Sequence, residues 1–300
     1  MGAEVAASGL EQARRCVEEA LERSLAPESA WPGTIHRAMR YSVFGGGKRI
    51  RALLALEAGR AVGGQPDELL PFACAVELIH TYSLIHDDLP AMDDDDLRRG
   101  QPTSHKVFGE AIAILAGDAL LTRAFELLSA VPEQWDHDRC GRRWRATAQL
   151  ASACGTRGLI GGQVEDLETE GRPATPEGLE RIHRAKTGAL LLAAVRGGAM
   201  IGGASPRELG QLTRYGEALG LAFQIVDDVL DATGSRQQLG KTPGKDRAAG
   251  KATYVGIHGL EPARRRARQL LDEALEAVAA FAARGAALET LARAIVERTG

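Results

Sequence analysis

Apolar residues recur at intervals of three and four along almost the whole chain, the spacing that places them on one face of an α-helix. This spacing runs through six long segments, at 10–25, 68–88, 110–131, 176–202, 205–234 and 262–285. No segment alternates apolar and polar residues strictly over six or more positions, so the pattern does not predict a β-sheet. Aromatic residues make up only 4% of the chain, and Ala and Leu lead its apolar content, which also favours helices. We therefore predict an all-α fold.

The sequence also indicates where some of these helices begin and end. Ser205 and Thr175 each precede a proline, the residue that suits the first position of a helix, and Gly234 follows the end of another helix. The stretch 131–146 is the most irregular part of the chain, and we expect a charged loop there between two helices. Because no Pro-rich or low-complexity linker divides the chain, residues 1–300 are predicted to form a single helical-bundle domain.

Composition restricts the partners and the surroundings of the protein. A formal net charge of −3 leaves no basic field for nucleic acid, so we expect no nucleic-acid partner. The N-terminal stretch 1–25 lacks the apolar core of a signal peptide, and no uncharged apolar run is long enough to span a membrane. The cysteines form no CxxC pair, which excludes the usual zinc sites and predicts free thiols in a cytoplasmic protein. They are Cys16, Cys74, Cys140 and Cys154.

Two acidic clusters interrupt helices that are otherwise apolar nearly all round, a kind of helix that lies inside a bundle. The first cluster, in LIHDDLPAMDDDDLRRG (84–100), places six aspartates in ten positions. The second lies in LAFQIVDDVLD (221–231), with its polar residues on one helical face. Carboxylates beside buried helices cost several kcal/mol each unless they are paired, protonated or bound to metal. A solvated acidic face is the alternative, but recurrence on two apolar helices favours a binding site.

Oxygen ligands without a His or Cys cluster select a hard cation such as Mg²⁺, which bridges carboxylates to substrate phosphates. The first cluster is not a calcium loop of the EF-hand type, because it lacks the required Gly and Glu. FGGGKR is not a nucleotide-binding P-loop, since Ser42 and Arg49 stand where Gly and Ser or Thr are needed. The aspartates therefore predict a phosphorylated ligand. Gly-flanked basic groups would supply its other contacts: GGGKRIR (Lys48, Arg49, Arg51), LRRG (Arg98, Arg99), AKTG (Lys186, Thr187) and GKTPGKDRAAGKATY (Lys241, Lys245, Lys251).

From about residue 34 to the C-terminus, these motifs resemble the short-chain trans-isoprenyl diphosphate synthases, and within them the bacterial farnesyl type. DDLPAMDDDDLRRG resembles the first aspartate-rich motif of that family, and FQIVDDVLD resembles the second, DDxxD. GGGKRIR, AGDALL, GGQVEDL, HRAKTGALL and GKTPGKD…KATY match further family blocks in the family's order. The resemblance implies helices around a deep central cavity, a homodimer, and condensation of isopentenyl diphosphate with dimethylallyl or geranyl diphosphate to give farnesyl diphosphate.

The resemblance also implies roles for individual residues. Three Mg²⁺ ions, for which Mn²⁺ can substitute, would lie between the motifs, ligated by Asp87, Asp93 and Asp227, with Asp88, Asp231 and Asp228 as water-mediated or hydrogen-bonding partners. Contacts to the allylic diphosphate are implied for Arg98, Lys186, Thr187, Gln224, Lys241 and Lys251. Contacts to isopentenyl diphosphate are implied for Lys48, Arg51, His80 and Arg99. Catalysis is assigned to Asp87, Asp93, Asp227, Lys186 and Lys241, and product length to Tyr82 with Ser83, one turn before Asp87.

These residue types suit a reaction that needs no protein nucleophile, because metals and lysines can stabilise a departing diphosphate. Glycines around Lys241 and Lys251 suit a loop that closes over the site. Three alternatives remain: a geranylgeranyl diphosphate synthase, a class I terpene cyclase, and a non-catalytic regulatory paralogue. GGGKRIR and the intact DDxxD argue against a cyclase, and the retained aspartates argue against a paralogue. The chain departs from the family pattern at Ala52, where Pro is usual, and at its C-terminal IVERTG, which lacks a further basic residue.

Overall fold

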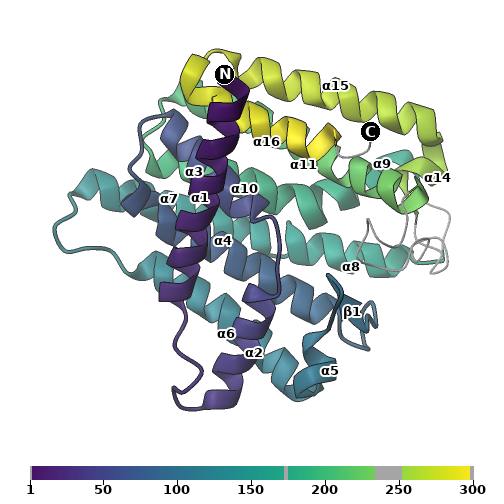
Figure 1. The fold of residues 1–300 in the computed structure, drawn as a ribbon. Coiled ribbons are helices and arrows are strands. Elements are labelled where there is room, and N and C mark those ends of the chain that lie inside the picture. The colour runs from purple at the N-terminus through teal and green to yellow at the C-terminus, as the bar shows by residue number, and fades with distance from the viewer. Residues whose placement is uncertain (1, 172–174, 234–251, 298–300) are drawn as a thin grey trace.

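The computed structural model describes residues 2–171, 175–233 and 252–297, which are mostly helical (Figure 1), so the all-α prediction is confirmed. The helices are α1 (Gly2–Ser24), α2 (Gly33–Phe44), α3 (Ile50–Ala61), α4 (Pro66–Asp87), α5 (Ser104–Phe108), α6 (Glu110–Ser129), α7 (His137–Cys154), α8 (Leu159–Thr169), α9 (Pro176–Ile182), the π-helix η1 (His183–Gly188), α10 (Ala189–Ile201), α11 (Pro206–Thr233), α14 (Tyr254–His258), α15 (Leu260–Ala279), the 3-10 helix η2 (Ala282–Gly285) and α16 (Ala286–Val296). A short antiparallel pair, β1 (Leu97–Arg98) and β2 (Gln101–Pro102), follows α4.

Side-chain caps explain several helix starts. Thr175 accepts a hydrogen bond from the Gly178 N–H at 3.1 Å, and Ser205 forms a reciprocal capping box with Glu208, so both predicted caps are confirmed. The predicted loop at 131–146 is wrong beyond residue 136. The Asp136 carboxylate accepts from the Arg139 N–H at 2.8 Å and starts α7 there. Gly234 lies outside the described residues.

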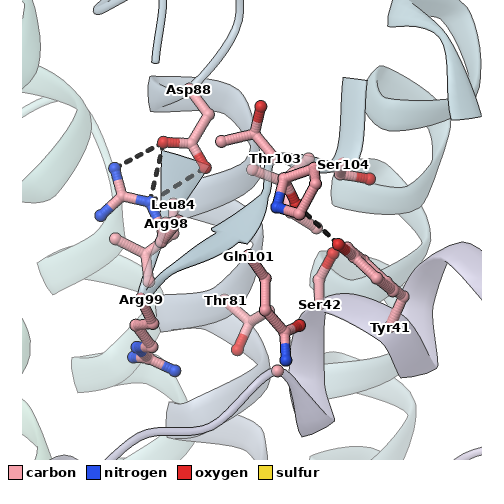
Figure 2. Close-up of a pocket in the computed structure, with 13 residues that line it drawn as sticks. Tyr41, Ser42, Thr81, Leu84, Asp88, Arg98, Arg99, Gln101, Thr103 and Ser104 are labelled. Atoms are coloured by element: carbon pink, nitrogen blue, oxygen red, sulfur yellow. Dashed lines mark hydrogen bonds and ion pairs between the residues drawn. The ribbon is translucent and has the colours of Figure 1, made fainter. Parts of the chain in front are cut away.

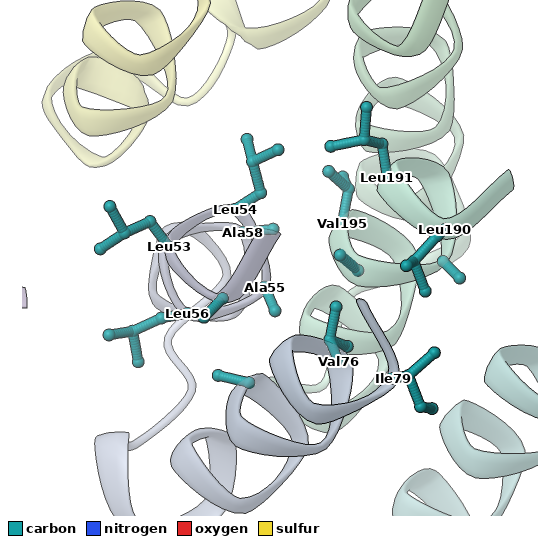
Figure 3. Packing of buried hydrophobic residues seen from close by; sticks show 14 of the residues in the cluster. Leu53, Leu54, Ala55, Leu56, Ala58, Val76, Ile79, Leu190, Leu191 and Val195 are labelled. Atoms are coloured by element: carbon teal, nitrogen blue, oxygen red, sulfur yellow. The ribbon is translucent and has the colours of Figure 1, made fainter. Parts of the chain in front are cut away.

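The centre of the fold is formed by α3, α4 and α10, whose apolar side chains pack together (Figure 3). Nine of the 12 residues of α3 are buried, as its nearly all-round apolar sequence predicts. A Cβ atom at Gly198 of α10 would lie 1.9 Å from the Ala55 carbonyl oxygen of α3, so glycine is what allows these two helices to approach so closely. By length and mean hydropathy α4 alone among the described helices could cross a membrane, but 72% of that window is buried in this core.

The remaining helices surround this centre, and the two acidic motifs lie at the C-terminal ends of α4 and α11. α6 packs against α4, and α11 packs against α10 and α15. The first motif begins at the C-terminal end of α4 and continues into the β1–β2 hairpin. The second lies in the last turns of α11, against which α14 and η1 also pack. The fold therefore assembles the site from helix ends that are far apart in the sequence.

Candidate active site

The first acidic motif folds back on the end of α4 through main-chain hydrogen bonds. The Asp93 N–H donates to the Asp87 carbonyl at 2.8 Å, and the Asp95 N–H donates to the Asp88 carbonyl at 3.2 Å. Asp88 is only 3% exposed, and its carboxylate accepts from Arg98 Nε at 2.7 Å and from Arg98 Nη2 at 2.5 Å (Figure 2). This ion pair ties the hairpin to the helix end, so Arg98 and Asp88 hold each other in place.

The electrostatics of this motif favour a bound cation. The pKa of Asp87 is raised to about 6, chiefly by burial; the carboxylates of Asp93 and Asp88 act in the same direction, and Lys186 and Arg98 oppose the rise. A divalent cation would remove the repulsion among these carboxylates. Within the described ranges, no three His, Cys, Asp or Glu side chains lie close enough to enclose a metal by themselves. Mg²⁺ fits such a site, because it keeps several waters and uses one or two carboxylates together with substrate phosphates.

Arg51 and His80, two residues predicted to contact the second substrate, form the centre of a basic cluster. Arg51 Nη1 lies 3.1 Å from His80 Nε2, and the Arg51 guanidinium lies over the Phe223 ring at 5.6 Å from its centroid. Burial holds the pKa of His80 well below its usual range, and Arg51 and Arg99 act in the same direction. The imidazole is therefore neutral and accepts from Arg51. The buried Arg51 Nε has no hydrogen-bond partner among the described residues, which suits an anionic ligand.

The glycines of GGGKRIR allow the loop before Lys48 to lie against Arg99 of the hairpin. Gly46 and Gly47 have φ angles of +94° and +131°, which side chains rarely adopt. A Cβ at Gly47 would lie 2.6 Å from Arg99 Nη1, and Arg99 donates to the Gly46 carbonyl. The structure thus brings Arg99 against the loop that carries the exposed Lys48.

One basic residue of this motif has a different role. Arg49 is buried at 4% exposure and donates to the Glu18 carboxylate at 2.8 Å and to the Val43 carbonyl at 2.7 Å. It therefore anchors α1 to the start of α3. The expectation that Arg49 contacts a ligand is wrong.

The second acidic motif belongs to a chain of hydrogen bonds that starts in the π-helix η1. Thr187 donates to Gln224 Oε1 at 2.9 Å, and Gln224 Nε2 donates to Asp228 Oδ1 at 3.2 Å. Asp228, 5% exposed, then accepts from the Tyr254 N–H at 2.6 Å through Oδ2. Asp227 and Asp231 are partly buried on the same helix. Asp228 therefore positions the segment that begins α14.

Asp166 and His183 lie near the second motif but were not predicted as site residues from the sequence. Lys186 Nζ forms an ion pair with Asp166 of α8 at 2.7 Å, and the buried His183 Nε2 lies 3.6 Å from Asp228 Oδ2. The sequence signal for Asp166 is its place in the GGQVEDL block, and that for His183 is its place as the first residue of HRAKTGALL. Burial lowers the pKa of His183 to about 4.

Each motif has an electrostatic interaction with a residue of another helix. Lys186 of η1 is close enough to Asp87 to lower the pKa of that carboxyl, and Asp227 of α11 is close enough to Arg51 of α3 to raise the pKa of that guanidinium against the effect of burial. Lys241 and Lys251 lie outside the described residues, so their predicted contacts stay predictions.

The residues predicted to set product length lie one turn before Asp87, as expected. Tyr82 is 6% exposed, and its hydroxyl has no hydrogen-bond partner among the described residues. Ser83 donates to the His80 carbonyl at 2.9 Å, which occupies its hydroxyl within α4. Tyr82 is therefore the residue of the two whose side chain is free of hydrogen bonds in the part of the chain described.

A cavity of about 50 Å³ lies behind the first motif, between α2, α4 and the hairpin (Figure 2). Asp88, Arg98, Arg99 and Thr103 line it, and Tyr41 closes one side by donating to the Pro102 carbonyl at 2.7 Å. The hairpin thus presents Arg99 to the loop of Gly46 and Gly47 while Arg98 stays with Asp88.

A helical fold that carries two aspartate motifs and a separate cluster of basic residues is typical of enzymes that act on diphosphate substrates. The family model described as Polyprenyl synthetase matches residues 32–290. Farnesyl diphosphate synthase of Escherichia coli (strain K12) is 48% identical over 297 residues, 96% of this chain and 98% of that protein. The chloroplastic heterodimeric geranylgeranyl pyrophosphate synthase large subunit 1 of Arabidopsis thaliana is 51% identical over 253 residues, 83% of this chain and 68% of that protein.

A solved structure of geranyltransferase from Helicobacter pylori, complexed with magnesium and isoprenyl diphosphate, aligns with a TM-score of 0.85. It is 32% identical, and the alignment covers 97% of each chain. The chain belongs to the polyprenyl synthetase family and is a prenyltransferase.

Proposed function

We propose that this prenyltransferase condenses isopentenyl diphosphate with dimethylallyl and geranyl diphosphates to give farnesyl diphosphate. The observation that supports this most directly is the presence of two charged clusters of side chains. One comprises Asp87 and Lys186, with the second motif bonded to η1 through Thr187 and Gln224, and suits a metal-bound diphosphate. The other comprises Arg51 and His80 and suits a diphosphate held by cations. Two diphosphate substrates need two such clusters.

The allylic substrate belongs in the first of these two clusters. When bound, Mg²⁺ would supply charge neutralisation for the departing diphosphate. We propose three ions, replaceable by Mn²⁺, held by Asp87, Asp93 and Asp227, with Asp231 and Asp88 acting through water. Both Asp88 oxygens already accept from Arg98, which argues against direct ligation there. The diphosphate contacts proposed for this side come from Arg98, Lys186, Thr187, Gln224, Lys241 and Lys251.

Basic side chains then stabilise the leaving diphosphate and orient isopentenyl diphosphate for the reaction. Lys186 stabilises the leaving oxygen as the C–O bond breaks, leaving an allylic cation among apolar side chains that exclude water. Lys48, Arg51, His80 and Arg99 hold isopentenyl diphosphate so that its double bond forms the new C–C bond with that cation. The product double bond forms when a proton leaves the adjacent carbon for the released diphosphate, so no protein base is consumed.

Product analysis tests this function. The protein is incubated with isopentenyl diphosphate and either dimethylallyl or geranyl diphosphate, with Mg²⁺ or with a chelator, and the products are separated by chain length. We expect a C15 diphosphate that depends on both isopentenyl diphosphate and the metal. A C20 product would identify the geranylgeranyl alternative, and a cyclic hydrocarbon formed without isopentenyl diphosphate would identify a cyclase.

We propose that residues 1–300 form one domain that assembles as a homodimer in the cytoplasm, with no nucleic-acid or membrane partner. On α6, Ile114 and Leu115 are 44% and 53% exposed, and burying them between subunits would remove apolar surface from water. All four cysteines are free, which suits a reducing compartment. Light scattering on the purified protein tests the dimer, and a monomeric mass at micromolar concentration would contradict it.

A further inference from the structure

His86 stands between Tyr82 and the neighbouring helix α6. It follows Tyr82 by four residues on α4, and the two rings meet edge to face, with centroids 5.7 Å apart and planes at 76°. His86 Nε2 lies 3.1 Å from the Ile114 carbonyl oxygen of α6 and 3.9 Å from Asp118 Oδ1. A carbonyl can only accept, so Nε2 carries a hydrogen and donates it. This bond fixes the ring against α6.

Gly117 makes room for that ring. A Cβ atom at Gly117 would lie 2.1 Å from His86 Nε2 and 2.6 Å from His86 Cδ2. Glycine inside a helix is less stable than alanine, and α6 is otherwise rich in good helix formers. The close approach of His86 gives a physical reason for glycine at this position.

Tyr82 depends on packing for its position, because its buried hydroxyl has no hydrogen-bond partner among the described residues. Burial raises the pKa of Tyr82 to about 12, and the Cys154 side chain of α7 acts in the same direction. The phenol therefore stays neutral, with the His86 ring on one side and Cys154 of α7 close by. The edge-to-face contact with His86 is what braces it from the side of α6.

We propose that His86 and Gly117 are positioning residues that set the place of Tyr82 and thereby the length of the product. This inference rests on the proposed function, in which the growing chain extends past Tyr82. The His86 ring supports the Tyr82 ring, and the missing side chain at Gly117 leaves room for the His86 ring against α6. Neither residue needs to touch the substrate.

The first test is His86→Ala, with products separated by chain length. Without the brace, Tyr82 can move toward α6, so the C20:C15 ratio is expected to rise about fivefold, the change that loss of one edge-to-face ring contact corresponds to. Gly210→Ala is the matched control, because nothing lies within 4 Å of a Cβ at Gly210. An unchanged or shortened product distribution in His86→Ala would overturn the proposal.

The second test asks whether Gly117 acts through His86. The methyl group of Gly117→Ala would take the place of Nε2 and push the ring onto Tyr82, so the C10:C15 ratio is expected to rise. In the double variant His86→Ala/Gly117→Ala that effect should vanish, leaving the distribution of His86→Ala. An equal shortening with and without His86 would mean that the substitution acts through α6 itself and would overturn this part of the proposal.

The two levels of inference can fail separately. If the wild-type protein makes no C15 product, the proposed function fails. If the wild type makes C15 and His86→Ala makes the same product with a melting temperature close to that of the wild type, only the role of His86 and Gly117 fails.

Discussion

In each DD pair of this site, the two aspartates differ in burial and in hydrogen bonding. Asp88 and Asp228, the second aspartates, are buried and accept hydrogen bonds from Arg98 and from the Tyr254 N–H. Asp87 and Asp227, the first aspartates, are more exposed and lie near Lys186 and Arg51 across the site. We therefore expect the first residue of each pair to face the substrates, while the second holds the local structure.

Asp227→Ala is expected to lower kcat by more than about tenfold, or 1.4 kcal/mol, because barrier lowering at this site is almost wholly electrostatic. The melting temperature should stay close to that of the wild type. Steady-state kinetics with saturating Mg²⁺ measure the effect, and Asp67→Ala, on the exposed first turn of α4, is the control. Retention of more than about a tenth of wild-type kcat would remove Asp227 from the metal site.

Lys48→Ala is expected to raise KM for isopentenyl diphosphate much more than KM for the allylic substrate. Lys48 follows the Gly46–Gly47 turn that contacts Arg99 and precedes Arg51 by three residues, so we expect its charge to add to that of the basic cluster. Varying one substrate at saturation of the other measures both constants. Equal increases in the two KM values would show that Lys48 does not serve the isopentenyl diphosphate site specifically.

Tyr82→Ala is expected to shift products from C15 toward C20 and longer chains. Removing the phenol opens space beside His86 and Cys154 one turn before Asp87, in the direction in which we propose that the product chain grows. Chain-length analysis measures the shift, and Ser83→Ala, whose hydroxyl only bonds the His80 carbonyl, is the comparison. A C15 distribution like that of the wild type would place the floor of the cavity elsewhere.

At the scale of elements, the sequence predicted most helices but not their local departures. The segment 176–202 has the periodicity of one continuous helix, yet the structure contains the π-helix η1 at its centre. A Cβ at Gly162 of α8 would lie 2.3 Å from the Lys186 main-chain nitrogen, so η1 is shaped by its contact with α8. Such a contact joins residues distant in sequence and leaves no trace in local periodicity. Wide turns of this kind occur often at functional sites, as here with Lys186 and Thr187.

The start of α7 was missed for a different reason. A high density of charged residues at 137–146 indicated a loop, but the Asp136 cap and a partly buried face outweighed it. Arg143 is buried on that face and donates to the Glu68 carbonyl at 2.6 Å while its guanidinium lies over Trp135. A buried arginine cannot be told from a solvated one by composition.

Gly198→Ala is expected to destabilise the fold by about 1–3 kcal/mol, because the added methyl group meets main-chain atoms of α3 that cannot move aside. Gly210→Ala, in the exposed part of α11, should be neutral or stabilising by up to about 1 kcal/mol through helix propensity. Urea unfolding followed by circular dichroism measures both. Equal stability of the two variants would contradict the close approach of α3 and α10.

At the scale of the molecule, the site joins parts of the chain that periodicity could not relate. Asp227 of α11 is close enough to Arg51 of α3 to raise its pKa, and Lys186 of η1 is close enough to Asp87 of α4 to lower its pKa. Helical spacing predicted which face of each helix was polar, but not which faces would meet. The resemblance in motifs supplied that relation, but it assigned no role to Asp166 or His183, which lie beside Lys186 and Asp228.

This arrangement predicts that metal and diphosphate together stabilise the whole fold. Mg²⁺ with inorganic pyrophosphate would link the end of α4 to η1 and α11, and a ligand that binds only the folded state at 100 times its Kd adds about 2.7 kcal/mol to the free energy of unfolding. The melting temperature should therefore rise by several degrees, at about 2–4 °C or less per kcal/mol for a chain of this size.

Thermal unfolding is measured with chelator, with Mg²⁺ alone, with pyrophosphate alone and with both, and the full rise is expected only with both. Asp227→Ala should lose most of that rise while keeping the melting temperature of the unliganded protein. If pyrophosphate gave the same rise in the presence of chelator, the basic residues alone would hold the diphosphate, and the two aspartate motifs would not be joined through metal.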